Sequence, residues 1–144
     1  MMLLSNWDVK DDREGDESNN SIFRVPDANL LFYGVSDWGA ALGRWGGPRR
    51  RDKSDCSGYT RDTHRFVQGD VRDTVEFNYS GKYENDIREG ISIDDVRWLL
   101  PYLQRVTPDE LREGLKASGA TARQTTCWSN AIENRVRQLQ TAAR

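Results

Sequence analysis

Two carboxylates that flank a pair of strand-like runs are the residues of this sequence that could carry chemistry. The first, Asp8, lies in the stretch NWDVKDD, with Lys10 two positions later. The second, Asp37, follows the apolar run LLFYGV almost directly and begins Asp-Trp-Gly. Taken alone, Asp8 is typical of an exposed turn, where Asp and Asn are common. The position of Asp37 after the two runs is what makes Asp8 a candidate catalytic group.

The chemistry that such a pair supports is phosphoryl transfer. One carboxylate orients the attacking hydroxyl group, and a second carboxylate, together with an amide oxygen, holds Mg²⁺ against the phosphates. The runs SIFRV and LLFYGV are separated by Pro-Asp-Ala-Asn and predict a β-hairpin. A hairpin brings the loop before its first strand and the residues after its second strand to one edge. We therefore expect Asp8 and Asp37 to lie at the same edge.

These residues resemble the C-terminal lobe of the protein-kinase-like superfamily, in an atypical bacterial branch whose catalytic loop reads Asn-Trp-Asp-x-Lys. The resemblance implies that Asp8 is the catalytic base and that Lys10 neutralises the transferring phosphate. It also implies that Asp37 is the metal-binding residue of the Asp-Phe-Gly motif, in which Trp38 replaces the Phe and Gly39 keeps the flexible hinge.

The metal-binding asparagine of this family is displaced in the sequence. The family motif places it five residues after the catalytic Asp, where this chain has Arg13. Asn19 and Asn20 stand directly before SIFRV, where the corresponding residue belongs, so an insertion around REGDES explains the shift. The resemblance implies that Asn19 or Asn20 joins Asp37 in holding Mg²⁺. Two turn asparagines before a strand are the alternative interpretation.

The resemblance covers roughly residues 3–39 by motif and the later helices more loosely. Only five residues precede Asn6, and the sequence contains neither G-x-G-x-x-G nor G-x-x-x-x-G-K-[ST]. Because such elements anchor the nucleotide phosphates, we expect a phosphotransferase fragment that lacks the nucleotide-binding lobe and is not active alone. In intact relatives the implied reaction transfers the γ-phosphate of ATP to an acceptor hydroxyl, with Mg²⁺ as cofactor.

A basic loop, GRWGGPRRRDK, supports a different class of function. Basic side chains beside an aromatic ring can bind phosphate and stack on a base. The net charge of -2 gives the whole chain no attraction to nucleic acid, so we do not expect nucleic acid as a partner. The alternative is a non-catalytic helical interaction domain that binds a protein or an anionic partner through this loop. Its basic and aromatic residues are Arg44, Trp45, Arg49, Arg50, Arg51 and Lys53.

Residue counts nearly exclude other metal sites. Cys56 and Cys127 are the only cysteines and His64 is the only histidine, too few for a zinc site built from Cys and His. The acidic run near residues 11–17 fits no EF-hand register. The local spacing suggests no Ser or Cys partner for His64, so a hydrolytic triad is unsupported.

The two cysteines also suggest where the protein is located. With no C-x-x-C pair, we expect two free thiols, as in a reducing cytoplasm. The opening MMLL is too short for a signal peptide, and no run approaches the roughly 18 apolar residues of a membrane span. We therefore expect a cytoplasmic protein without a membrane partner.

The elements that must position these residues follow from composition and periodicity. The chain has 144 residues with 36% hydrophobic content and five Trp, which indicates one globular unit. We divide this single kinase-like domain into the catalytic-loop and hairpin region 1–39, a long loop region 40–90 and a helical region 91–144. Residues 36–65 lack an apolar period and predict a long irregular loop. Val75, Phe77 and Tyr79 then alternate with polar residues and suggest a short strand.

Three helices are expected in the C-terminal region. The first follows Ser92, which has Asp95 three positions later, the second covers about residues 108–118, and the third covers about 122–141. Together with the hairpin, they give an α+β fold that is mostly α, with the long loop between hairpin and helices. The apolar residues expected to face the core are Val96, Leu99, Leu100, Leu103, Leu111, Leu115, Trp128, Ile132, Val136 and Leu139.

Overall fold

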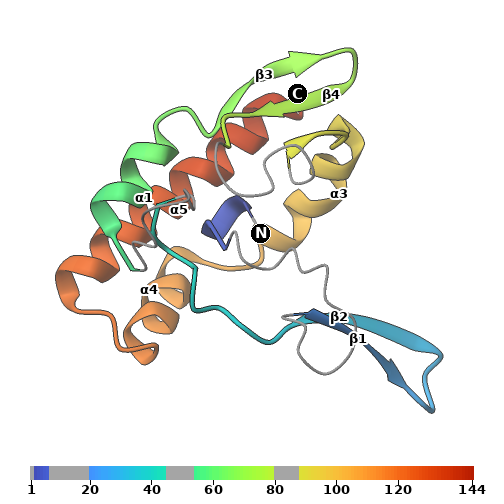
Figure 1. The fold of residues 1–144 in the computed structure, drawn as a ribbon, viewed down its shortest axis with the longest axis horizontal. Helices are drawn as coiled ribbons and strands as arrows, with labels where there is room; N and C mark the ends of the chain where they lie inside the picture. Colours follow the sequence, from blue (N-terminus) through green and yellow to red (C-terminus); the bar gives the residue numbers. More distant parts are fainter. Residues whose placement is uncertain (1, 7–19, 45–53, 80–87) are drawn as a thin grey trace.

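The computed structural model describes residues 2–6, 20–44, 54–79 and 88–144. Figure 1 shows that the fold is α+β and mostly helical, as the sequence predicts. The elements in chain order are the short 3-10 helix η1 (Met2–Leu4), β1 (Asn20–Val25), β2 (Leu30–Val35), α1 (Cys56–Thr63), β3 (Val67–Val71), β4 (Thr74–Phe77), α3 (Ile93–Leu103), α4 (Pro108–Ala117) and α5 (Ala122–Ala142).

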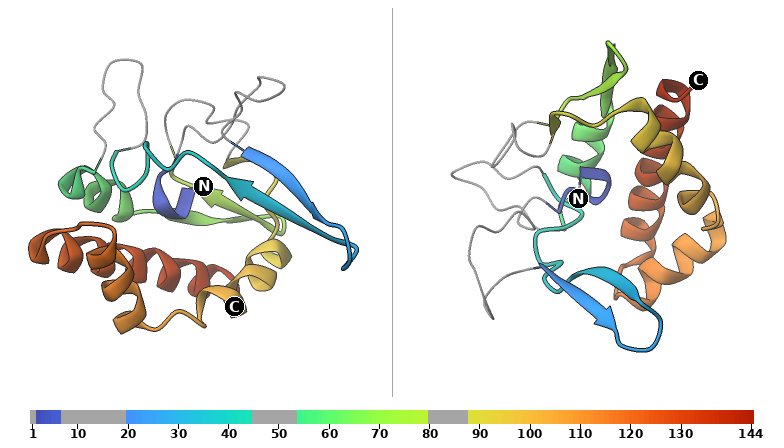
Figure 2. Two further views of the ribbon diagram at one scale, coloured as in Figure 1. Left: turned by 90° about the horizontal axis from the view of Figure 1, so that it is seen from below. Right: turned by 90° about the vertical axis from the view of Figure 1, so that its right-hand side faces the viewer.

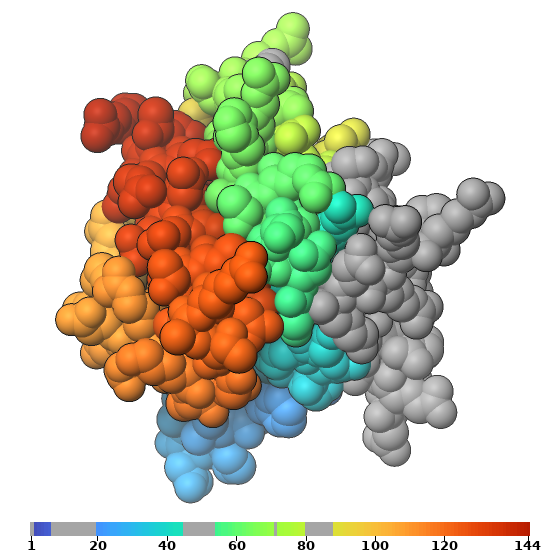
Figure 3. Space-filling model, turned by 90° about the vertical axis from the view of Figure 1, so that its left-hand side faces the viewer, coloured from blue at the N-terminus to red at the C-terminus, as the bar shows by residue number. Residues whose placement is uncertain are grey.

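Helix α5 is the centre of the packing. Helices α1, α3 and α4, strand β3 and the 3-10 helix η1 all pack against it. Figure 3 shows α1 in green directly beside α5 in orange to red on one face of the molecule. Although α5 is 21 residues long, neither it nor another helix in the described ranges has an apolar stretch that could cross a bilayer.

Two clusters of buried apolar side chains form along α5. The predicted inward stripe is confirmed, because Trp128, Ile132 and Leu139 are buried and Val136 packs against the first cluster. The first cluster joins η1, the β3–β4 hairpin, α3 and the C-terminal half of α5 through Met2, Ala40, Phe66, Val75, Phe77, Tyr79, Val96, Leu100 and Leu139. The second joins α1, α4 and α5 through Tyr59, Leu115, Trp128, Ala131 and Ile132.

The three C-terminal helices begin where the sequence predicts, each at a capping box. At the start of α3 the Asp95 backbone N–H donates to the Ser92 hydroxyl oxygen at 3.1 Å, and the Asp95 carboxylate accepts from the Ser92 backbone N–H at 2.8 Å. Thr107 and Glu110 make the same pair of bonds at the start of α4. These bonds satisfy backbone donors that a helix leaves unpaired in its first turn.

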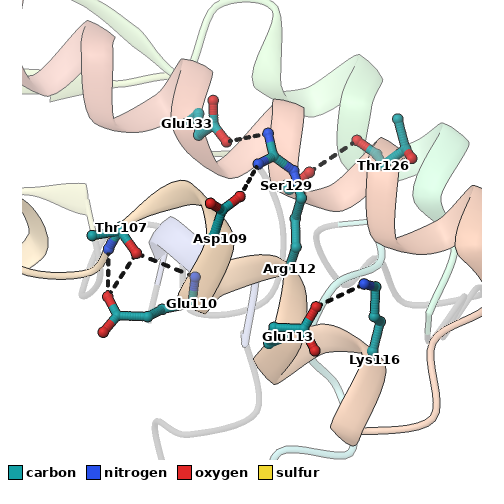
Figure 4. A network of polar contacts seen from close by, with 9 residues as sticks. All are labelled: Thr107, Asp109, Glu110, Arg112, Glu113, Lys116, Thr126, Ser129 and Glu133. Atoms are coloured by element: carbon teal, nitrogen blue, oxygen red, sulfur yellow. Dashed lines mark hydrogen bonds and ion pairs between the residues drawn. The ribbon is translucent and has the colours of Figure 1, made fainter.

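Polar contacts fasten α4 to α5 (Figure 4). Arg112 donates to the Asp109 carboxylate at 3.0 Å on its own helix and lies 3.6 Å from the Glu133 carboxylate on α5. A second ion pair, between Lys116 and Glu113 at 2.7 Å, runs along α4. Such partly exposed pairs stabilise a protein little, so the α4–α5 contact depends chiefly on buried Leu115.

The predicted hairpin is confirmed as β1 and β2, paired antiparallel with Asn20 opposite Val35 and Val25 opposite Leu30. Figures 1 and 2 show that it projects away from the helical body. A second antiparallel hairpin, β3–β4, lies against α5. Its strand β4 confirms the strand predicted from alternating residues.

The prediction of an irregular loop over residues 36–65 is wrong in its last third. Helix α1 begins at Cys56, so the described residues contain four helices where three were predicted. The physical reason is the composition of the buried face of α1, which consists of Gly58, Tyr59 and Thr63. Without aliphatic side chains at helical spacing, this face gives no apolar period that sequence analysis could detect.

The prediction of two free thiols is also wrong. Cys56 at the start of α1 and Cys127 in α5 form a disulfide, with their Cα atoms 6.3 Å apart. They are 71 residues apart in the sequence, and the packing of α1 on α5 is what brings them together. The thiol argument for a reducing compartment is therefore removed, since structural disulfides persist in oxidising environments.

Candidate functional site

The segment that leads into the predicted catalytic loop is held by a buried arginine of α5. Arg135 is fully buried, and its Nη1 donates to the backbone oxygens of Met2 at 2.7 Å and Leu3 at 3.0 Å. The same nitrogen lies 3.0 Å from the hydroxyl oxygen of Ser5, to which it donates. One side chain of the last helix thus fixes the position of the residues just before Asn6.

The contacts around Arg135 hold its guanidinium group in one position and keep it positively charged. Its guanidinium lies 3.9 Å from the ring centre of Tyr59 and 4.8 Å from that of Phe66, and Nε donates to the hydroxyl of Thr63 at 2.8 Å. Burial lowers the pKa of Arg135, whereas Tyr59 and the Asp62 carboxylate raise it. Burial raises the pKa of Tyr59 to about 12, against the opposing charge of Arg135. Arg135 remains charged at neutral pH.

The residues just before the predicted catalytic loop lie beside the Asp-Trp-Gly segment. The Asn6 side-chain amide donates to the backbone oxygen of Asp37 at 3.1 Å, although the two residues are 31 positions apart. A second bond runs from the Leu42 backbone N–H to the Leu4 backbone oxygen at 2.8 Å. Asn6 is fully buried, so its orientation is fixed by the surrounding structure. Residues 4–6 and 37–42 therefore form one unit.

The Asp37 carboxylate is placed at the surface of this unit. Asp37 is exposed, and its Oδ1 accepts a hydrogen bond from the Gly39 backbone N–H at 2.6 Å. The Trp38 indole N–H donates to the Val35 backbone oxygen at 3.2 Å, which fixes the chain where β2 ends. A carboxylate that is held by a backbone N–H and faces solvent has the chemistry of a hard-cation ligand.

The β1–β2 register places Asn20, a candidate Mg²⁺ ligand, near Asp37. Asn20 opens β1 opposite Val35, which lies two positions before Asp37. The structure thus brings the chain at Asn6, Asn20 and Asp37 to the base of the hairpin. Gly39 follows at the same place and donates to Asp37. The prediction that Asp8 lies at this edge with Asp37 is not tested, because Asp8 is outside the described residues.

Three other candidates lie outside the described residues. Asp8, Lys10 and Asn19 fall in the range 7–19. Among the described residues, no three His, Cys, Asp or Glu side chains come together as a metal cluster. The implied magnesium site differs from such a cluster, because it uses one carboxylate, Asp37, with an asparagine oxygen.

Of the basic and aromatic residues in the basic loop, only Arg44 is described. Arg44 lies 3.6 Å from the Asp55 carboxylate, and a Cβ added at Gly58 would meet the Arg44 side chain at 2.2 Å. Arg44 therefore lies across the glycine of α1 and helps to anchor the loop end. The remaining basic residues fall in the range 45–53, outside the described residues. His64 is exposed just after α1, as expected for a surface histidine.

Sequence analysis did not single out Arg135. The signal was present, because Arg135 lies three positions after Ile132 and four before Leu139, on the apolar stripe of α5. A charged residue at a core position of a helix is rare unless it has buried partners. The partners themselves, chiefly backbone oxygens near the N-terminus, carry no sequence pattern.

Comparisons with known proteins gave no match. No protein-family model matches the chain, and neither a curated protein nor a solved structure matches it.

Proposed function

We propose that this chain is a fragment of a kinase-like phosphotransferase, with Asp37 as a Mg²⁺ ligand and Asp8 as the catalytic base. The observation that supports the proposal is the hydrogen bond from Asn6 to the Asp37 backbone oxygen. It joins the residue two positions before Asp8 to the backbone of Asp37 across 31 positions of sequence. In the proposed arrangement, Asp8 and Asp37 come from separate loops to one edge, as phosphoryl transfer requires.

Each residue has a distinct role in this proposal. Asp8 orients the acceptor hydroxyl and takes its proton, and Lys10 neutralises the phosphate that is transferred. Asp37, together with the amide oxygen of Asn19 or Asn20, holds Mg²⁺. The ion, when bound, neutralises charge on the phosphates of ATP. An oxygen-only set of donors suits Mg²⁺, and the exposed Asp37 carboxylate fits such a set.

Turnover by these 144 residues alone is not expected. The sequence has no glycine-rich phosphate-binding motif, so little would hold the nucleotide in a reactive position. We propose weak Mg²⁺-dependent binding of ATP and no phosphoryl transfer. A cytoplasmic location stays a prediction, now without support from the cysteines.

The alternative function is that of an interaction domain. The sequence predicts its binding surface in the basic loop, of which residues 45–53 lie outside the described residues. A different surface favours the same class of function, because hairpin β1–β2 exposes several large apolar side chains.

The test is calorimetric titration of the purified chain with ATP, with and without Mg²⁺. Wild type is compared with Asp37→Asn, which keeps an oxygen acceptor for the Gly39 N–H but removes the charge. The matched control is Asp27→Asn, an exposed aspartate in the turn of the same hairpin. We expect Asp37→Asn to weaken Mg²⁺-dependent binding by about tenfold or more, equivalent to roughly 1.4 kcal/mol, and Asp27→Asn to leave it unchanged. Absence of Mg²⁺-dependent binding at millimolar ATP, or equal binding by wild type and Asp37→Asn, would refute the proposed role of Asp37.

A further inference from the structure

Apart from Trp38, the exposed large hydrophobic residues of the described ranges gather on two surfaces. One is hairpin β1–β2, and the other is the outer side of α3 with the turn that follows it. Hairpin β1–β2 and helix α3 both lie on the right-hand side of the molecule in Figure 1, the side that faces the viewer in the right-hand view of Figure 2. The exposed residues are Ile22, Phe23, Leu30, Leu31, Phe32 and Tyr33 on the hairpin, and Trp98, Tyr102 and Val106 on or just after α3.

One face of the hairpin has no charged residue. In an antiparallel pair, residues directly opposite share a face. Phe23 is opposite Phe32, and Val25 is opposite Leu30, so these four side chains form one apolar face, here called the phenylalanine face. A Cβ at Gly34 would lie 2.6 Å from the Phe23 ring, which shows that this ring packs against the glycine.

The opposite face of the hairpin is less suited to a protein interface. On this face Arg24 follows Ile22 along β1, and Leu31 of β2 lies opposite Arg24. The cores of protein interfaces are depleted of charged residues, so the phenylalanine face is the better candidate. Ile22, Leu31 and Tyr33 would remain as an exposed patch of a size that is common on monomeric proteins.

The second surface, here called the α3 stripe, consists of Trp98, Tyr102 and Val106 at four-residue spacing. The rings of Trp98 and Tyr102 contact each other with centroids 5.0 Å apart, and the Arg105 guanidinium lies 5.1 Å from the Tyr102 ring centre. Trp98 is 68% exposed, although the opposite side of α3 is buried in the core. Aromatic residues with an arginine are the composition typical of interface hot spots.

The sizes of the two surfaces point to a second copy of the chain as the partner. Applied to ordinary residue areas, the exposed fractions give roughly 350 Å² for the phenylalanine face and roughly 350 Å² for the α3 stripe. Either surface alone is smaller than a standard interface requires. If each copy uses both, roughly 700 Å² per copy is buried, which lies within the range of standard interfaces.

We propose that the chain forms a two-fold symmetric dimer in which the phenylalanine face of each copy packs on the α3 stripe of the other. The symmetry requires both surfaces on one side of the molecule, and the figures show that the two elements that carry them, hairpin β1–β2 and α3, lie on one side. The dimer also supports the hairpin, since a two-stranded hairpin is marginally stable by itself in water. Within the described residues, no helix or other strand packs extensively on β1 or β2.

The test uses one variant on each surface, Phe32→Lys and Trp98→Lys, in analytical ultracentrifugation over a range of concentrations. Wild type should be a dimer, and each variant should raise the dimer Kd about 100-fold or more, because both contacts lose an anchor. Leu31→Lys is the matched control, since Leu31 is 61% exposed on the opposite face of the same hairpin and its variant should dimerise like wild type. Tyr102→Lys is a second variant of the stripe, and circular dichroism checks that every variant is folded.

Mixing the two monomeric variants gives the decisive outcome. A mixed dimer of Phe32→Lys with Trp98→Lys keeps one intact contact, between the unchanged hairpin of one chain and the unchanged α3 stripe of the other. An equimolar mixture should therefore dimerise more tightly than either variant alone, although more weakly than wild type, which has two intact contacts. The proposal is overturned if wild type stays monomeric at high micromolar concentration, if the stripe variants dimerise as well as wild type, or if the mixture dimerises no more tightly than the variants do separately. The second outcome would indicate hairpin-to-hairpin packing, and the first a different partner.

Discussion

Replacing both Cys56 and Cys127 by serine should lower the stability of this fold considerably. The disulfide joins α1 to α5, and it closes a chain segment in which the two residues are 71 positions apart. In the chain-entropy description, a crosslink restricts the unfolded chain, and the restriction grows with the logarithm of the loop length. A loop of this length corresponds to about 4 kcal/mol of free energy of unfolding at 25 °C. For a chain of 144 residues, that loss lowers Tm by roughly 10–15 °C.

Two measurements test this expectation. Thiol titration of the denatured protein with Ellman's reagent should detect no thiol before reduction and two after it. Thermal unfolding should then give a lower Tm for Cys56→Ser/Cys127→Ser than for the oxidised wild type. A reductant should lower the Tm of wild type to about the same value, and it should have no effect on the double variant, which serves as the control.

The reasoning fails if the unreduced protein already contains two titratable thiols. It also fails if the disulfide is present but its reduction changes Tm by less than about 2 °C, because the loop-length effect would then be absent. The first result would return the two cysteines to the free thiols that the sequence suggested, and the second would show that the crosslink contributes little to stability.

Two further predictions concern buried and capping side chains. Arg135→Met should reduce the free energy of unfolding, measured by urea denaturation, by about 3–5 kcal/mol, because the backbone oxygens of Met2 and Leu3 lose their buried donor. The control Arg137→Met, at an exposed position of α5, should change it by less than about 0.5 kcal/mol. Equal effects of the two variants would contradict the role of Arg135. The pKa values of Asp95 and Glu110 are lowered by their hydrogen bonds to the helix caps, so their stabilising contribution is present above the usual carboxyl pKa of about 4 and is lost as pH falls below it. The stability difference between wild type and Asp95→Asn/Glu110→Gln should therefore shrink as pH is lowered from 6 to about 3, and a difference that does not depend on pH would count against this assignment.

Local signals explain which elements were predictable. The pairs Ser92 with Asp95 and Thr107 with Glu110 are three residues apart, so the helix starts are encoded within a single turn. The β1–β2 hairpin is equally local, because its turn residues connect two apolar runs directly. Helix α1 was missed because its buried face is built around Tyr59 and a glycine, and it is helical in a region whose composition favours a loop.

In the candidate site, too, local features were predictable from the sequence and long-range contacts were not. The sequence by itself determined the residue types near the hairpin, the order in which Asp8 and Asp37 occur, and the extent of the C-terminal helices, since all of these depend on neighbours within a few positions. Only the tertiary structure decided that Asn6 meets Asp37 and that Cys56 meets Cys127. These contacts join residues 31 and 71 positions apart, and they form because α5 packs with both α1 and η1, which no local pattern specifies.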